Sequence, residues 1–399
     1  MADNEMPENG SADGATFDDW NSELEEEVVA DDIGSLIVYS RDWTVETILS
    51  QIEKGNIDLN PSFQRRNAWN DLKRSKLIES LIIGVPVPEI VLAEDKDKKR
   101  SFIVIDGKQR LLAIAGFAEP EKYPTWTSAK LRGLNTKKDL NGCTYEGMTV
   151  MGLESEDIRQ LRNADIRCTV ISNYASIQVL YDIFYRLNSG SVPLSSQELR
   201  QVLNRGEFAN YLIKTTDAVL PVHKVLNLSE PDTRLRDAEI LLRFISFSLF
   251  GGTYTGNLTP FLDTTMATIN GAWGARREEV ERLVAEFNAA TALLLDVMPP
   301  KKVGRKFTPD GWESRFNRAL FEVQVYYISR VPEDVVRANE ADFVARFQAL
   351  CLESLEFIDS IETSTKNIKK YHLRYRLFQD LVNEVFHTEI DSIPVPLAG

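Results

Sequence analysis

The pattern of apolar and polar positions divides the chain into a mixed first part and a helical second part. Between residues 35 and 117, short β-type runs alternate with stretches whose apolar residues recur three and four positions apart. Asn70 and Gly84 are typical helix-cap residues and mark the ends of one such stretch. The predicted strands are 36–39, 90–93 and 102–105, and the predicted helices are 44–55, 70–84 and 108–116.

A stretch rich in Pro, Gly, Thr, Asn and Lys, residues 118–150, predicts a long excursion over the surface. A helix near 155–163, a strand at 166–171 and a helix at 177–187 follow. Beyond them the apolar spacing is helical throughout, with breaks at proline and glycine. The predicted segments are 195–203, 206–214, 237–250, 276–296, 312–329, 341–360 and 366–386. We therefore expect an α+β protein, with a small α/β head at 33–173 and a larger α-helical domain at 174–399.

The formal charge of −14 is concentrated near the N-terminus. Residues 1–40 contain twelve Asp or Glu and no Lys or Arg, which leaves −2 for the rest of the chain. A stretch of this composition buries too little apolar surface to fold by itself, so we expect a disordered acidic tail over residues 1–32. Its role is open between a solubilising arm and an arm that mimics DNA and covers a basic groove.

Cysteine and histidine positions exclude several classes of site. Cys143, Cys168 and Cys351 are too far apart for a disulfide framework or a paired metal motif, and the three histidines are equally scattered. A zinc site, or the His-rich metal site of an HNH-type nuclease, therefore lacks its ligands. No apolar run approaches the ~20 residues that cross a bilayer, and the N-terminus has no secretory signal. We expect a cytoplasmic protein with no membrane partner and reduced, buried thiols.

The sharpest candidate for chemistry is Asp106-Gly107-Lys108-Gln109-Arg110, between a predicted strand and a predicted helix. The first N–H groups of a helix lack backbone partners and lie at the positive end of its dipole, so this junction suits phosphate. Gly107 lets a ligand approach the backbone, and Lys108 and Arg110 supply cations. Asp106 has the chemistry to hold Mg²⁺ or to orient water. The spacing also fits an ordinary turn in which Asp106 only caps the helix and Lys108 and Arg110 are solvated.

Two further clusters carry side chains that suit a nucleotide. Residues 63–69 combine aromatic rings with Gln64 and Arg65, which fits a stacked base and a phosphate held by a guanidinium. Arg186 and Asn188 lie where the predicted helix 177–187 ends in a polar turn that contains glycine, and there they have the means to close over a ligand. The plainer interpretations are aromatic anchors in the core and a helix C-cap with an exposed ion pair.

The last predicted helix carries basic residues interleaved with two tyrosines. This mixture fits contact with a DNA backbone, and a solvated helix face is the alternative. The candidate DNA-binding residues are Lys369, Lys370, Arg374 and Arg376.

Taken together, the three clusters resemble the N-terminal domain family of GmrSD-type, modification-dependent restriction endonucleases, which is related to the ParB/sulfiredoxin-like fold. The resemblance lies in the order of three motifs and covers residues 35–270 well and the remainder loosely. Asp106–Arg110 stands where the family has a DGQQR-type motif, with Lys108 where Gln is frequent. The motifs are Phe63-Gln64-Arg65 with Trp69, Val104 to Leu111, and Phe184 to Asn188.

The resemblance implies a ParB-like nucleotide-binding head that binds and hydrolyses a nucleoside triphosphate with Mg²⁺, coupled to a nuclease that attacks modified phage DNA. On this basis we expect an NTPase of restriction or anti-phage defence. The region after residue 300 lacks the HNH pattern that many relatives carry, so we expect DNA and a separate nuclease or effector as partners. The expected catalytic residues are Asp106, Gln109 and Arg110, with Asp106 also holding Mg²⁺, and the expected nucleotide-binding residues are Gln64, Arg65, Gly107, Lys108, Arg186 and Asn188.

Two other functions fit the same residues. One is a non-enzymatic, ParB-like DNA-binding adaptor that grips DNA with the basic C-terminal helix. The other is a weak DNA nickase whose metal site uses carboxylates alone. The preferred base, the DNA modification and the oligomeric state are open, and a homo-oligomer is compatible with the sequence.

Overall fold

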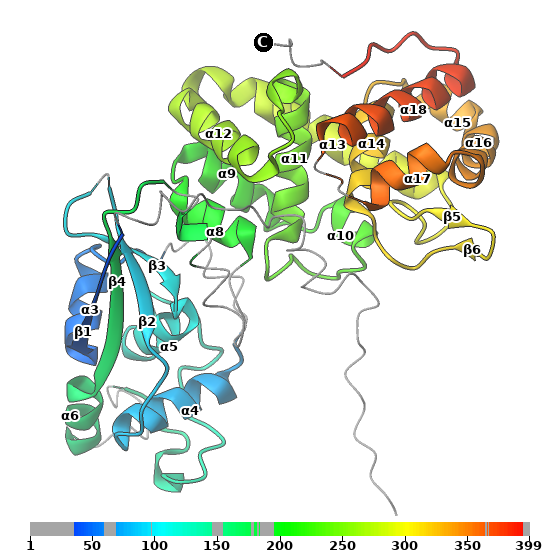
Figure 1. Cartoon of the computed structure of the whole chain (residues 1–399). Helices are drawn as coiled ribbons and strands as arrows, with labels where there is room; N and C mark the ends of the chain where they lie inside the picture. Colours follow the sequence, from blue (N-terminus) through cyan, green and yellow to red (C-terminus); the bar gives the residue numbers. More distant parts are fainter. Residues whose placement is uncertain are drawn as a thin grey trace, which may run out of the picture. The chain divides into compact units, whose positions relative to one another are not determined.

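The computed structural model of the chain describes residues 36–59, 69–96, 98–145, 155–176, 179–181, 183, 195–363, 365 and 367–393. These residues form two compact units that divide between Arg205 and Gly206, which we call the sheet domain and the helical domain (Figure 1). The sequence pattern placed the division near residue 173 instead. The expected tail, residues 1–32, lies outside the described residues, and the α+β class is confirmed.

The sheet domain is built on a mixed four-stranded sheet in the order β1-β4-β2-β3. β1 and β3 run antiparallel to their neighbours, whereas β2 and β4 are parallel to each other. The strands are β1 (Ile37–Thr44), β2 (Ile90–Glu94), β3 (Phe102–Asp106) and β4 (Asp165–Ser172). The helices are α3 (Val45–Glu53), α4 (Asp71–Ile82), α5 (Lys108–Ala118), α6 (Ser155–Asn163), α8 (Ser196–Leu203) and the 3-10 turn η3 (Lys138–Leu140).

The predicted elements of this domain occur with small changes of bounds. Thr44 and Asn70 cap α3 and α4 through their side-chain oxygens, as their residue types favour. The first strand is longer than predicted because pairing with β4 extends it to Thr44. The predicted helix 177–187 falls largely outside the described residues.

Helix α5 lies in the core of the sheet domain. Its residues 111–115 are all apolar and almost completely buried, and a helix that is apolar on every side requires cover on every side. α3 and α4 pack against it, and the excursion after it adds further cover: the Trp126 indole donates to the Ala113 carbonyl at 3.0 Å. This packing fixes the start of α5, where the candidate motif lies.

The excursion was predicted to run over the surface, and its described part is instead anchored inside the domain. Tyr123, Trp126 and Leu131 are buried. The buried Asp71 carboxylate accepts from the Thr127 N–H at 3.2 Å and from the guanidinium groups of Arg74 and Arg132. One buried carboxylate thus fastens the excursion to α4.

The helical domain differs from the predicted pattern at several places. Trp312 belongs to a short hairpin, so the helix predicted from 312 begins only at Arg318. Ser354 caps a new helix in the middle of the predicted segment 341–360. The helices at 221–225, 258–271 and 333–338 were not predicted. The elements are α9 (Glu207–Thr216), α10 (Pro221–Val225), α11 (Arg236–Phe250), η4 (Gly251–Thr253), α12 (Leu258–Gly271), α13 (Trp273–Val297), β5 (Phe307–Thr308), β6 (Gly311–Trp312), α14 (Arg318–Ile328), α15 (Glu333–Ala338), α16 (Glu340–Glu353), α17 (Leu355–Glu362) and α18 (Ile368–Phe386).

Aromatic rings and a buried charge network fill the core of the helical domain. Phe247 stacks on Tyr371 with ring centroids 5.0 Å apart. Beside the rings, the Arg243 guanidinium bridges Glu239 on its own helix and Glu322 on α14, at 2.9 and 2.7 Å. Buried charges of this kind are stable only when paired, so the network fixes how α11 and α14 pack.

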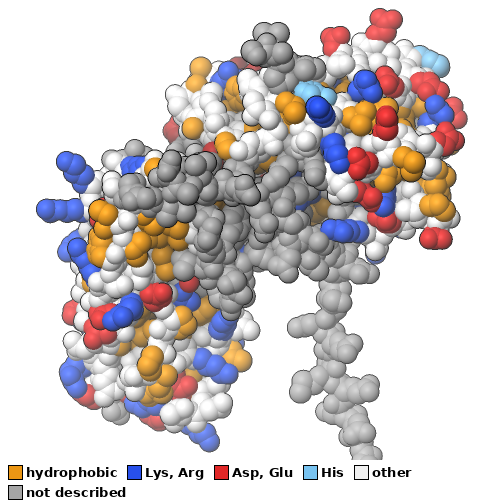
Figure 2. Space-filling model, in the orientation of Figure 1, with side chains coloured by type: hydrophobic (Ala, Val, Ile, Leu, Met, Phe, Trp, Pro, Cys, Tyr) orange, Lys and Arg blue, Asp and Glu red, His pale blue; other side chains and the backbone are white. Residues whose placement is uncertain are grey.

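The surface of the helical domain carries many acidic side chains. Figure 2 shows Asp and Glu gathered over the part that holds α15 to α18. In the described ranges, no helix has the length and apolar composition that crossing a membrane requires. Cys143, Cys168 and Cys351 are all buried as free thiols, as expected.

Candidate functional site

The candidate motif lies at the junction between β3 and α5, with a single glycine between them. Gly107 has φ 91° and ψ 8°, in the left-handed region, and it is the N-cap of α5 without any side-chain cap bond. Asp106 therefore ends the strand and does not cap the helix. A Cβ at residue 107 would lie 3.0 Å from the Ile90 Cγ1 atom and 3.1 Å from the Arg110 Nη2 atom. Both the backbone angle and the close approach require glycine here.

Arg110 is held in place by two acceptors at the ends of the strands. Its Nη2 atom donates to Asp106 Oδ2 at 2.7 Å and to the Glu89 carbonyl oxygen at 2.8 Å. The side chain is 9% exposed, and its Nε atom is buried with no acceptor among the described residues. The guanidinium is thus pre-positioned, with a buried donor still unsatisfied.

Lys108 is buried beside Arg110, with 6% of its surface exposed. Burial lowers the pKa of this ammonium group to about 8, against the opposing effect of the Glu198 and Asp58 carboxylates. The turn interpretation, in which Lys108 is solvated, is therefore wrong. Two cations are packed into the first turn of α5, where the helix dipole is also positive.

Gln109 adds a third polar group to the same turn. Its Oε1 atom is buried and accepts no hydrogen bond from any residue that the structure describes. Buried polar atoms are nearly always paired in folded proteins, so such atoms mark positions that merit an explanation. Gln109 Oε1 and Arg110 Nε are two such atoms in this turn.

Helix α8 contacts β3 and brings further polar side chains into the sheet domain. Glu198 is fixed by a capping box, in which its carboxylate accepts from the Ser195 N–H at 2.6 Å. Gln197 and Arg200 are completely buried and bonded to each other at 2.7 Å. Long polar residues are seldom buried to this degree, which indicates a polar interior beside the motif.

Three residues that the sequence did not single out lie around this interior. Arg205 pairs with Asp58 at 3.1 Å and lies 3.7 Å from an Asp95 carboxylate oxygen. Arg205, Asp58 and Asp95 come from three separate segments of the chain, and none of them belongs to a sequence motif. Only folding brings them together, and the charge of Asp58 then acts on Lys108.

Asp106 has the features of a single metal ligand. Its side chain is 28% exposed, and the partner of that side chain among the described residues is Arg110, which contacts Oδ2. The described residues contain no group of three His, Cys, Asp or Glu side chains with the geometry of a metal site. Mg²⁺ in nucleotide sites is commonly held by one or two carboxylates together with phosphate oxygens and water, so the donor set fits that mode of binding. The role of Asp106 in holding Mg²⁺ stays a prediction.

Four expected nucleotide-binding residues lie outside the described residues: Gln64, Arg65, Arg186 and Asn188. Their roles stay predictions. Trp69, at the edge of the same motif, is described and packs partly buried against the core, with the Lys73 ammonium 4.5 Å from its ring centroid. The packing interpretation therefore applies to this ring.

The four candidate DNA-binding residues do not share one environment. Arg374 is 3% exposed, donates to the Thr365 carbonyl oxygen and lies near Glu322. Its guanidinium is therefore engaged within the domain and does not face solvent. Lys370 is paired with Asp359 at 2.9 Å. Lys369 and Arg376 are exposed. DNA contact stays a prediction. Because Lys369 and Arg376 are exposed, they are the two candidates best placed to contact DNA phosphates.

Comparison with known proteins assigns the segment that contains the motif. Residues 45–203, from α3 to α8, match the family model described as "GmrSD restriction endonuclease, N-terminal domain". No curated protein and no solved structure matches the chain. The matched segment lies within the sheet domain and includes Asp106–Arg110.

Proposed function

We propose that this chain, whose residues 45–203 match the family model of the GmrSD restriction endonuclease N-terminal domain, binds and hydrolyses a nucleoside triphosphate at the β3–α5 junction in the course of DNA restriction or defence. The family assignment supports the role in restriction or defence. The nucleotide step rests on the geometry of residues 106–110.

The observation that carries the proposal is the burial of two cations in the first turn of a helix whose cap has no side chain. Lys108 and Arg110 are 6% and 8% exposed, and Gly107 has no side chain that could cap the helix N-terminus. Removing cations from water is costly unless an anion compensates. Asp106 already pairs with Arg110, and the Glu198 and Asp58 carboxylates act on Lys108. A triphosphate would add its negative charge beside both cations, and the helix N-terminus would add backbone donors for it.

The same residues suit hydrolysis as well as binding. Asp106 and the Glu89 carbonyl hold the Arg110 guanidinium rigidly, so little reorganisation accompanies the charge that develops on phosphate. Gln109 has a free amide oxygen with which to orient water. With a pKa of about 8, Lys108 is protonated at neutral pH and serves as a cation. Bound Mg²⁺ would neutralise part of the phosphate charge, and Asp106 is the residue of this turn with the chemistry to hold it.

Phosphate release from ATP, GTP, CTP and UTP, with and without DNA, tests the proposal. Arg110→Lys keeps a cation but loses the planar guanidinium with its several donors. We expect it to lower kcat by ~10²-fold, in line with the loss of one pre-organised donor. Lys108→Gln should raise KM more than it lowers kcat. Lys122→Ala removes an exposed cation just beyond α5 and is the matched control.

Two results would oppose the proposal. Unchanged hydrolysis in folded Asp106→Ala and Arg110→Lys variants would place any activity elsewhere. Absence of turnover with every nucleotide, together with DNA binding that weakens steeply with salt, would favour the adaptor.

We also propose that a separate nuclease or effector performs DNA cleavage. The sequence after residue 300 has two histidines, His372 and His387, and no metal-ligand spacing. Incubation of supercoiled plasmid with the purified chain and Mg²⁺ tests this point. We expect no nicking; nicking that disappears in Asp106→Ala would support the nickase instead.

A further inference from the structure

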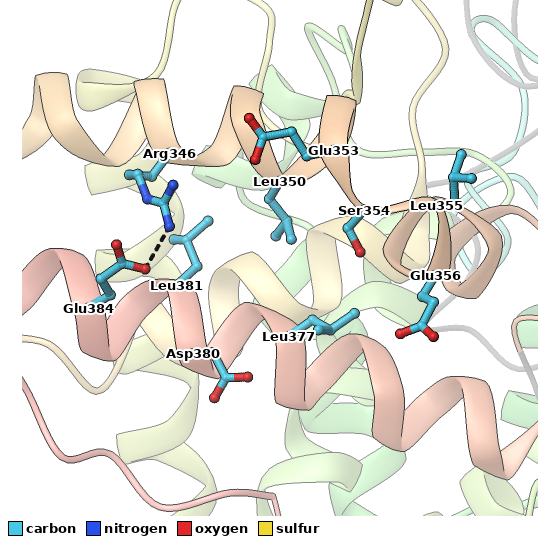
Figure 3. A pocket seen from close by; sticks show the side chains of 10 residues that line it. All are labelled: Arg346, Leu350, Glu353, Ser354, Leu355, Glu356, Leu377, Asp380, Leu381 and Glu384. Carbon is cyan, nitrogen blue, oxygen red and sulfur yellow. Dashed lines mark hydrogen bonds and ion pairs between the residues drawn. The ribbon is translucent and has the colours of Figure 1, made fainter.

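The helical domain has an open groove between α16, α17 and α18, far in sequence from the motif. It has a volume of about 450 Å³. Figure 3 shows Leu350 of α16 and Leu377 and Leu381 of α18 extending into the space between the helices. The floor of the groove is therefore aliphatic, and its volume is in the range that holds several aliphatic side chains.

Carboxylates surround this apolar floor. Glu353 lies at the end of α16, Glu356 at the start of α17 and Asp380 on α18 (Figure 3). None of these three forms an ion pair with a residue in the part of the chain that the structure describes. At one end of the groove, Arg346 and Glu384 pair across α16 and α18 at 2.7 Å, so the single lining cation is already neutralised.

Leu355, at the first position of α17, lies on the rim of the groove and is 82% exposed. Ser354 caps the helix through the Phe357 N–H, so the helix start is satisfied without any contribution from the leucine side chain. Scattered exposed leucines are common. Leu355, however, lies beside the apolar floor and three carboxylates, so the groove presents apolar and acidic groups on one surface.

We propose that this groove docks a basic amphipathic helix of a partner protein. Apolar residues at helical spacing would pack on Leu350, Leu377 and Leu381, and flanking Lys or Arg would meet the three carboxylates. The negative rim repels a DNA backbone. It also repels the acidic residues 1–40 of this chain, which have no Lys or Arg. The inference concerns a different domain from the nucleotide site and does not depend on it.

Selection of peptides from a random phage-displayed library on the immobilised full chain tests the proposal. We expect enrichment of peptides with leucine-type residues at helical spacing and Lys or Arg beside them. Binding of these peptides, followed by fluorescence anisotropy, should weaken about tenfold or more in Leu355→Ala and in the double variant Glu353→Lys with Glu356→Lys. All three positions are exposed, so these variants should fold normally.

Leu352→Ala is the matched control, because Leu352 is 46% exposed on α16 and does not line the groove. Its peptide binding should equal that of the wild type. The proposal is overturned if no groove-dependent peptide is enriched, or if the enriched peptides are acidic or bind all variants alike. Self-association of the purified chain that Leu355→Ala abolishes would also overturn it, since a second copy would then be the occupant.

Discussion

The Nη2 atom of Arg110 lies 2.7 Å from Asp106 Oδ2, so an ion pair joins the first turn of α5 to the last residue of β3. Gly107 is the residue between the strand and the helix, and its left-handed backbone makes this approach feasible. The cation is consequently oriented by the fold itself.

Gly107→Ala should destabilise the sheet domain more than Gly84→Ala. Both glycines have positive φ, 91° and 74°, so alanine costs about 1–2 kcal/mol at either position. At Gly107 the new Cβ also presses on Ile90 and Arg110, whereas at Gly84 no atom of the described residues lies within 4 Å of it. Urea unfolding, monitored by hydrogen exchange within residues 102–118, measures the difference in stability between the two variants. Equal losses would show that the contact is relieved without cost.

The free energy of unfolding should depend on pH through Lys108. Its pKa is about 8 in the folded chain and 10.5 when exposed, so between these values the unfolded state binds a proton that the folded state does not. Stability attributable to this group therefore rises as pH increases from about 8 to 10.5, by an amount on the order of 3 kcal/mol.

Comparison with Lys108→Met isolates this effect, because other titrating groups are the same in both proteins. The variant should be the more stable one below pH 8, and its advantage should shrink as pH rises through the window. A constant difference between the two proteins from pH 7 to 10.5 would contradict the burial of a titrating ammonium group. Excess ATP should shift the pH range over which this difference changes to higher values, since bound phosphate favours the charged lysine.

Asp71→Asn should cost about 3 kcal/mol, the typical result of breaking a buried ion pair, since Arg74 is left buried without its charge partner. Burial opposes ionisation of Asp71, but the Thr127 N–H and the Arg132 and Arg74 guanidiniums outweigh it and lower its pKa. Its contribution is present above its ordinary pKa of 3.8 and is lost as pH falls through the lower folded value.

Asp42→Asn is the control for that substitution. Asp42 also pairs with an arginine, Arg167, and its pKa is also lowered, chiefly by the hydrogen bond from Arg167. Its side chain is 52% exposed, however, so water replaces the lost partner and the unfolding midpoint should barely move. Similar losses in both variants would contradict the anchoring role of Asp71.

DNA affinity should fall in the double variant Lys369→Ala with Arg376→Ala, equally for unrelated sequences. Two phosphate contacts would be lost, so the slope of log affinity against log salt should decrease by about 2. The double variant Arg277→Ala with Arg282→Ala removes two exposed arginines from α13 and should change neither quantity. Equal effects of both pairs would indicate a general charge effect in place of a binding site.

The sequence by itself determined most of the elements and the position of the motif. Period-2 and period-3.6 patterns, with caps such as Asn70, are local properties of a segment and survive in any fold that buries its apolar face. For this reason Asp106–Arg110 was placed correctly between a strand and a helix. Local pattern failed at Ser354 and Trp312, where a cap and a hairpin interrupt apolar spacing that continues across them.

Only the tertiary structure decided what the motif residues do. The sequence does not state that the Arg110 guanidinium turns back to Asp106 and the Glu89 carbonyl, or that Asp58 and Glu198 act on Lys108. Nor does it show that Arg374 of the basic helix is buried. These properties depend on distances between segments far apart in the chain, and desolvation and Coulomb energies follow those distances and not the order of residues.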